Sequence, residues 1–163
     1  MRAVLHSTHR PSWLERQRQG QGWIVAIEFS LEADAQLEQG ALTDVLTRCG
    51  AQEFKRTDRG FNGWFPDSGL NFYVRIRSVE QELGSASPEA VLAEFLPSPQ
   101  DWRVEYRINF RYNSGEYDAC RNTLREVVAC LVESSPCKFV VSCQYENVYC
   151  LRNQGGLEIF KVI

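Results

Sequence analysis

Several residue types and patterns that identify common protein classes are scarce or missing in this sequence. The 163 residues include one methionine and two histidines, His6 and His9. A serine or cysteine hydrolase usually needs a histidine base close to its nucleophile. Neither GxxxxGK(S/T) nor GxGxxG, the two glycine patterns that bind phosphates, occurs. The sequence therefore disfavours the usual nucleophilic hydrolases and nucleotide-binding enzymes.

Long apolar runs are missing as well. No uninterrupted run approaches the roughly 18 residues that a membrane-spanning helix needs. Residues 1–22 contain only Ala3, Val4 and Leu5 as a continuous apolar stretch, which is shorter than the core of a secretory signal peptide. We therefore expect a cytoplasmic protein that has no membrane partner.

The spacing of the six cysteines does not suggest a metal site. Five of them fall in the last 44 residues, and no C-x-x-C pair occurs. Cys120 shares an apolar helical period with Leu124 and Val127, and Cys143 alternates with apolar residues in a predicted strand. Free cysteine often behaves as a small buried hydrophobe. We expect reduced, metal-free cysteines in the core, with a zinc site as the alternative.

Charge is unevenly distributed along the chain. Arginine outnumbers lysine by 15 to 3, and residues 1–22 carry four arginines against one glutamate. Residues 23–163 carry 14 basic and 20 acidic side chains, a net charge of −6. This acidic body disfavours nucleic-acid binding and suits a basic partner. A net charge of this size also serves simply to keep a small domain soluble.

The chain repeats one pattern. Apolar residues alternate with mostly polar ones over residues 23–31, and again over 102–110 at a constant offset of 79. Each stretch reads as a half-buried strand. Each is followed by a helical pattern, with Leu42 and Val45 in the first copy matching Leu124 and Val127 in the second at an offset of 82. The repeat indicates two related units, each of which must cover an apolar sheet face.

These patterns predict an α+β fold built from a duplicated strand-helix-three-strand unit, with mostly antiparallel sheet and both helices on one side. We assign a flexible N-terminal arm to residues 1–22, the first unit to 23–77, a connector to 78–101 and the second unit to 102–163. Asp34 is the expected N-cap of the first helix, which Gly50 ends. In the connector, Ser87 and Pro88 fit the cap and first position of a helix over 88–95.

Charged residues on the predicted strands allow two interpretations. Arg103, Arg107 and Arg111 share one strand face, which could form a platform for RNA. Pairing with acids such as Glu28 and Glu32 on the related strand is the favoured interpretation. Outward carboxylates in such strands are ordinarily part of a solvated face rather than a catalytic pair.

The end of the chain carries a family resemblance. Residues 139–153, FVVSCQYENVYCLRN, followed by Gly156 and Leu157, resemble the closing strands of small bacterial immunity proteins. That resemblance implies a cytoplasmic α+β protein, encoded beside a polymorphic or contact-dependent toxin, that neutralises the toxin by binding it. It implies no catalytic or cofactor-binding residues.

We therefore expect a non-enzymatic immunity protein whose partner is a protein toxin with a basic rim around its active site. The alternative is an α+β module that binds a small ligand or RNA. Aromatic residues favour the centre of protein interfaces and charged residues the rim. On this basis we predict partner contacts at Trp64 and Phe65, in a glycine-rich stretch, and at Glu80 and Glu82 in the connector. The alternative to partner binding is that the aromatic residues of this stretch fold back onto the sheet.

Overall fold

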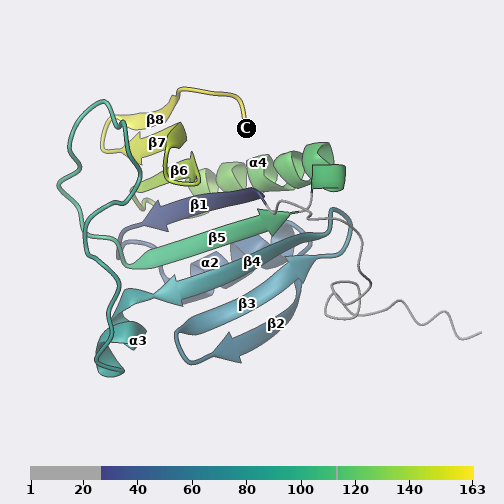
Figure 1. Ribbon diagram of the computed structural model, residues 1–163, viewed down its shortest axis with the longest axis horizontal. Coiled ribbons are helices and arrows are strands. Elements are labelled where there is room, and N and C mark those ends of the chain that lie inside the picture. The colour runs from purple at the N-terminus through teal and green to yellow at the C-terminus, as the bar shows by residue number, and fades with distance from the viewer. Residues whose placement is uncertain (1–26, 113) are drawn as a thin grey trace, which may run out of the picture.

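The computed structural model describes residues 27–112 and 114–163 (Figure 1). The predicted arm and residues 23–26 of the first predicted strand lie outside this range. The helices and strands follow in the order β1 (Ile27–Ala33), α2 (Gln39–Arg48), β2 (Gln52–Thr57), β3 (Gly60–Phe65), β4 (Leu70–Ile76), α3 (Arg77–Glu82), β5 (Tyr106–Tyr112), α4 (Tyr117–Ser134), β6 (Phe139–Cys143), β7 (Asn147–Asn153) and β8 (Gly156–Ile159). No helix in the described part of the chain is long and apolar enough to cross a lipid bilayer.

All eight strands of the described part of the chain belong to one sheet. Its order is β2-β3-β4-β5-β1-β6-β7-β8, and every neighbouring pair is antiparallel. Helices α2 and α4 lie together behind the sheet in the view of Figure 1, in contact with each other. The predicted α+β fold, with the helices on one side, is therefore confirmed.

The predicted repeat appears in the order of the helices and strands along the chain. β1 and β5 begin and end 79 residues apart, and each is followed by a helix and three strands. The two strands also pair with each other in the middle of the sheet. The predicted helix-facing positions Leu42, Val45, Leu124 and Val127 are all buried. The helix-facing positions of both units are thus buried in one core, as the pattern predicted.

The two sets of three strands are nevertheless arranged in opposite orders. In the first unit the last strand, β4, lies next to the central pair and β2 forms the edge. In the second unit the first strand, β6, lies next to the centre and β8 forms the edge. Superposing β1 on β5 therefore does not bring β2 onto β6, and whole units do not superpose. Two hydrogen bonds between Asp34 and Lys138 hold the start of β6 beside the end of β1.

The sequence predicts Asp34 as a helix cap, but in the structure Asp34 connects the end of β1 to the start of β6. Its Oδ1 accepts hydrogen bonds from the backbone N–H groups of Gln36 and Lys138. The residues after Asp34 form a turn that buries Leu37, and α2 starts only at Gln39. The predicted end of the helix at Gly50 is confirmed, because Gly50 has a φ of +93°, a conformation that glycine adopts easily.

The connector is irregular at 88–95, where a helix was predicted. Glu32 is completely buried, and its carboxylate accepts hydrogen bonds from the backbone N–H groups of Leu92 and Ala93. The same carboxylate pairs with the Arg107 guanidinium at 3.0 Å. A helix would direct these N–H groups along its own axis, so the buried acid outweighs the local preference of Ser87 and Pro88.

Arg107 fixes the same segment from its other side. Its guanidinium donates to Ser87 Oγ at 3.0 Å and to the carbonyls of Pro88 and Ala90 at 2.7 Å each. Underneath, a second apolar cluster lies between the connector and the sheet, and consists of Ala93, Trp102, Val104, Val140, Val148 and Leu151. Residues 102–105, predicted as strand, belong to this layer, and β5 begins at Tyr106.

Candidate partner-binding surface

The structure separates the four predicted contact residues. Phe65 is buried and packs its ring against Phe72 at a centroid distance of 5.5 Å. Glu80 is also buried, where it pairs with Arg75 at 2.5 Å. Neither side chain reaches the surface, so both are removed from the set of accessible contacts. The physical reason is that β3 and β4 form a regular hairpin, which turns alternate side chains of the glycine-rich stretch inward.

Trp64 and Glu82 remain accessible but lie apart. Trp64 pairs with Asn71 near the start of β4, whereas Glu82 ends α3, which follows the end of β4. Trp64 is half-buried on the sheet face opposite Phe65, and its indole Nε1 has no hydrogen-bond partner among the described residues. No single surface therefore combines the predicted aromatic and acidic contacts.

The three arginines of the possible RNA platform are engaged in ion pairs. Arg107 pairs with Glu32, and Arg111 pairs with Glu28 at 2.9 Å. Each of these pairs joins residues directly opposite in the β1–β5 register. Arg103, in the layer before β5, reaches Glu89 at 3.4 Å. The favoured interpretation, an intramolecular ladder of acids and arginines, is confirmed.

The cysteines lie in and around the core. Cys120, Cys137 and Cys150 are buried, and the other three are half-buried. Burial raises the pKa of the Cys150 thiol to about 12. Burial, together with a hydrogen bond to Cys130, raises the pKa of Cys49 to about 12 as well. Within the described residues, no three histidine, cysteine or acidic side chains are grouped as a metal site.

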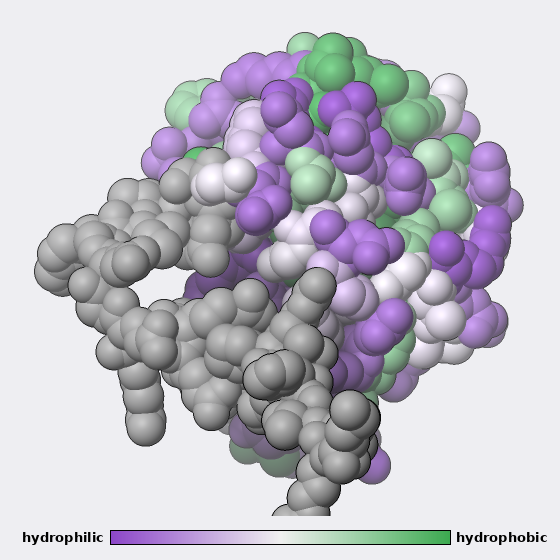
Figure 2. All heavy atoms as spheres, turned by 90° about the vertical axis from the view of Figure 1, so that its right-hand side faces the viewer, coloured by the Kyte–Doolittle hydropathy of each residue, from purple (hydrophilic) through white to green (hydrophobic). Residues whose placement is uncertain are grey.

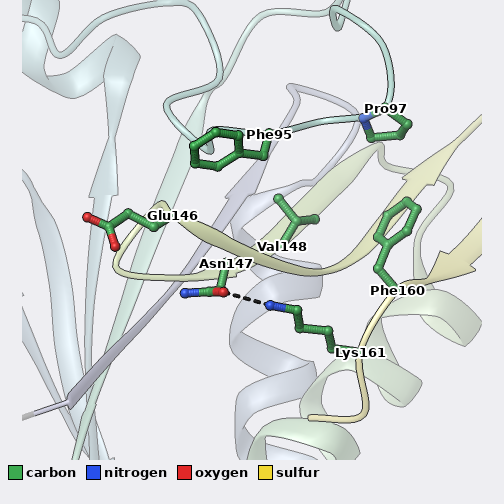
Figure 3. Close-up of a pocket in the computed structure, with 7 residues that line it drawn as sticks. All are labelled: Phe95, Pro97, Glu146, Asn147, Val148, Phe160 and Lys161. Atoms are coloured by element: carbon green, nitrogen blue, oxygen red, sulfur yellow. Dashed lines mark hydrogen bonds between the residues drawn. The ribbon is translucent and has the colours of Figure 1, made fainter.

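A groove lies at one end of the sheet, between the connector, the β6–β7 turn and the segment after β8. It has a volume of about 520 Å³. Figure 3 shows the side chains around it, which come from the connector, the β6–β7 turn with the start of β7, and the segment after β8: Phe95 and Pro97, then Glu146, Asn147 and Val148, then Phe160 and Lys161. The groove therefore combines apolar walls with one acid and one base.

Phe95 is the most exposed large apolar residue of the groove. Its side chain is 82% exposed, and its backbone has a φ of +58°. A bulky residue in this left-handed region costs roughly 1–3 kcal/mol, which contacts of the surrounding structure must offset. Here the preceding residue, Glu94, donates its N–H to the carbonyl of Tyr145 at 2.6 Å. The connector is thus fixed to the β6–β7 turn just before Phe95 projects outward.

The β6–β7 turn, which forms the neighbouring wall, has the same kind of strain. Gln144 and Tyr145 have φ values of +51° and +63°, and Glu146 donates its N–H to the carbonyl of Cys143 at 3.1 Å. Consecutive left-handed residues with this hydrogen bond are typical of a tight hairpin turn that usually contains Asn-Gly. Strained backbone often clusters at functional sites. This end of the sheet is therefore a candidate functional site.

The third wall is fastened to the body of the protein. Phe160 and Lys161 both donate their N–H groups to the carbonyl of Tyr149, at 2.8 and 3.2 Å. The Lys161 ammonium donates to Asn147 Oδ1 at 2.6 Å (Figure 3). Arg121 donates to the carbonyl of Val162 at 2.7 Å, and Ile163 is buried in the main core. The groove is therefore held in shape before any partner binds.

Exposed apolar side chains concentrate at this end of the sheet. Of the eight large hydrophobic residues exposed in the described part of the chain, Phe95 and Phe160 line the groove, and Leu157, Ile159 and Val162 lie on β8 or in the segment after it. Figure 2 shows apolar surface gathered at the top of the molecule, the level of β8 and the C-terminal segment in Figure 1. A concentrated apolar surface is more typical of an interaction site than isolated exposed hydrophobics are.

Sequence reasoning did not select this surface. The sequence predicts a helix over 88–95, which includes Phe95, and a strand over 157–162, which includes Phe160 and Lys161, so neither stretch suggests a site. The available signal was Pro97 and Pro99, because a proline disfavours helical backbone at the residue before it, here Leu96 and Ser98. No protein-family model matches the chain, and neither the curated proteins nor the solved structures gave a significant match.

Proposed function

We propose that this protein is a non-enzymatic immunity protein that binds a protein toxin through the groove between the connector, the β6–β7 turn and the C-terminal segment. The observation that carries the proposal is the exposed, strained Phe95, which lines one wall of a preformed groove while Phe160 lines another. Aromatic anchors in well-packed pockets account for most of the binding energy in many protein interfaces. A groove whose walls are already fixed loses little conformational freedom on binding.

The charge of the body supports a basic partner. Residues 23–163 carry a net charge of −6, and Glu146 lies in the wall of the groove. An acidic surface accelerates association with a basic partner at low salt. A toxin with a basic rim around its active site would be such a partner. Its association with this protein should then slow as the salt concentration increases.

The RNA-binding alternative loses its main support in this structure. The arginines that would contact phosphates are paired with Glu28, Glu32 and Glu89. Releasing them for RNA would leave buried Glu32 without its cation, which is costly. We therefore favour a protein partner over RNA.

Co-expression with the toxin encoded beside this protein tests the proposal. The protein should protect cells, and Phe95→Ala should weaken its affinity for the purified toxin by about 2 kcal/mol, or roughly 30-fold. The matched control is Leu83→Ala, because Leu83 is also an exposed apolar residue but lies after α3. Trp64→Ala separately tests the partner contact that the sequence predicts at Trp64.

Three results would contradict the proposal. The first is absence of protection although both proteins are soluble together. The second is turnover of a substrate by the purified protein, which would make it an enzyme. The third is equal affinity of Phe95→Ala and wild type for the toxin, which would move the binding site away from the groove.

A further inference from the structure

The two edges of the sheet are built differently. At the β2 edge, a register shift between Gln52 and Lys55 interrupts the pairing, and Glu53 within it has a φ of +53°. This strand also carries the charges of Glu53, Lys55 and Arg56. Bulges and charged residues are the usual means by which proteins prevent edge strands from pairing with other chains. The β2 edge is therefore protected.

The β8 edge has little of this protection. Leu157 and Ile159 are 37% and 68% exposed, and Glu158 is the single charged residue of the strand. The strand pairs with β7 in continuous register from Gly156 to Ile159. Within the described chain, no strand lies beyond β8. An exposed, regular and apolar edge of this kind is a template for another strand.

The backbone groups of β8 that point toward the open edge belong to Leu157 and Ile159. Phe160 donates its N–H to the carbonyl of Tyr149 in β7. In an antiparallel ladder the direction of the backbone N–H and C=O groups alternates from one residue to the next. The N–H and C=O groups of Leu157 and Ile159 therefore point away from β7, toward the open edge.

Their side chains lie on the helix-covered face. Ile159 is opposite Cys150, which is part of the main core between sheet and helices. Leu157 lies two residues earlier and hence on the same face. A strand added to this edge in antiparallel orientation from a second copy would bring together four aliphatic side chains, two from each copy, on that face.

We propose that two copies of this protein associate through β8, in antiparallel orientation about a two-fold axis perpendicular to the sheet. An antiparallel edge is complementary to itself, because each strand offers both donors and acceptors. Residues 156–163 carry one acid, Glu158, followed by one base, Lys161. Antiparallel pairing centred on Ile159 sets the half of β8 that carries Glu158 against the segment after β8 in the other copy, which carries Lys161, and does so twice. This neutral segment lets two acidic bodies meet without like charges at the contact.

The interface is small, so the dimer is weak, with a dissociation constant in roughly the micromolar range. Sedimentation of the full chain over a dilution series should show the mass rising with concentration from 18.7 kDa toward twice that value. Ile159→Lys should weaken dimerisation at least about tenfold, since like charges then lie across the pair. Leu83→Lys, which changes another exposed apolar residue away from the edge, should dimerise like the wild type.

Amide hydrogen exchange separates this pairing from association through another surface. The N–H groups of Leu157 and Ile159 should gain protection as the protein concentration increases, while those of β2 should not. Three results would overturn the proposal: a monomer at every concentration, unchanged dimerisation of Ile159→Lys, or a dimer in which these two amides exchange as fast as in dilute protein. The experiment uses the protein alone, so it is independent of the toxin.

Discussion

Replacing Arg107 with methionine should destabilise the protein far more than replacing Arg111, although both arginines lie on the same face of β5 and pair with glutamates of β1. Arg107 is 3% exposed, and its partner Glu32 is completely buried. Breaking a buried pair by removing one partner typically costs about 3–5 kcal/mol, because it leaves an uncompensated charge. We expect a loss of that size for Arg107→Met.

Arg111→Met is the matched control. Arg111 is 54% exposed, and its partner Glu28 is only partly covered. Exposed pairs contribute about 0–1 kcal/mol, so this variant should unfold at nearly the same urea concentration as the wild type. The substitution, the strand and the sheet face are the same, so the difference between the two variants reports the buried setting of Arg107: its ion pair together with its bonds to Ser87, Pro88 and Ala90.

A double variant tests the physical reason. Glu32→Gln combined with Arg107→Met removes the uncompensated charge but keeps an amide oxygen that can accept from Leu92 and Ala93. The double variant should therefore be more stable than Arg107→Met alone. Hydrogen exchange at these two backbone amides should accelerate in Arg107→Met, because the connector loses its hold on the sheet.

The free energy of unfolding from urea titrations, monitored by tryptophan fluorescence, measures these effects. Equal destabilisation by Arg107→Met and Arg111→Met would refute the reasoning. So would a double variant less stable than Arg107→Met, because it would show that the stranded charge of Glu32 is not the dominant cost.

Three further predictions concern the core, pH and the thiols. Val127→Ala should reduce the free energy of unfolding by roughly 1–3 kcal/mol, measured in urea, because it deletes buried methyl groups; a loss near zero would contradict its place between helix and sheet. Burial alone would raise the pKa of Glu80, but hydrogen bonds from Ser87 and Arg75 lower it below the ordinary value. The stabilisation from ionised Glu80 is therefore present above the pKa of the unfolded chain and is lost as pH falls through the lower folded pKa. The stability gap between wild type and Glu80→Gln should narrow on acidification through that range, and a gap independent of pH would refute the assignment. Burial raises the pKa of the Cys137 and Cys150 thiols, so both should react slowly with a disulfide reagent in the native protein, whereas denatured protein without reductant should titrate six thiols; fewer than six would indicate disulfides.

The sequence by itself determined the parts of the fold that depend on local periodicity. Alternation of apolar and polar residues located β1 and β5, and the constant offset of 79 matches both of their ends. The same alternation placed Glu28 and Glu32 on one face of β1, and Arg107 and Arg111 on one face of β5. Their pairing was therefore predictable. Helical periodicity located the buried face of α4, because a period of 3.6 residues sets which side chains meet the sheet.

Only the tertiary structure decided how these elements meet. The opposite order of the two sets of strands depends on contacts between distant residues, such as Asp34 with Lys138. The connector could form a helix by local preference, but a buried carboxylate 60 residues away in sequence takes the N–H of Leu92. That bond keeps this part of the connector out of a helix and leaves Phe95 exposed in the wall of the groove. Local patterns carry no information about such a bond, because its energy comes from a charge that the rest of the fold has buried.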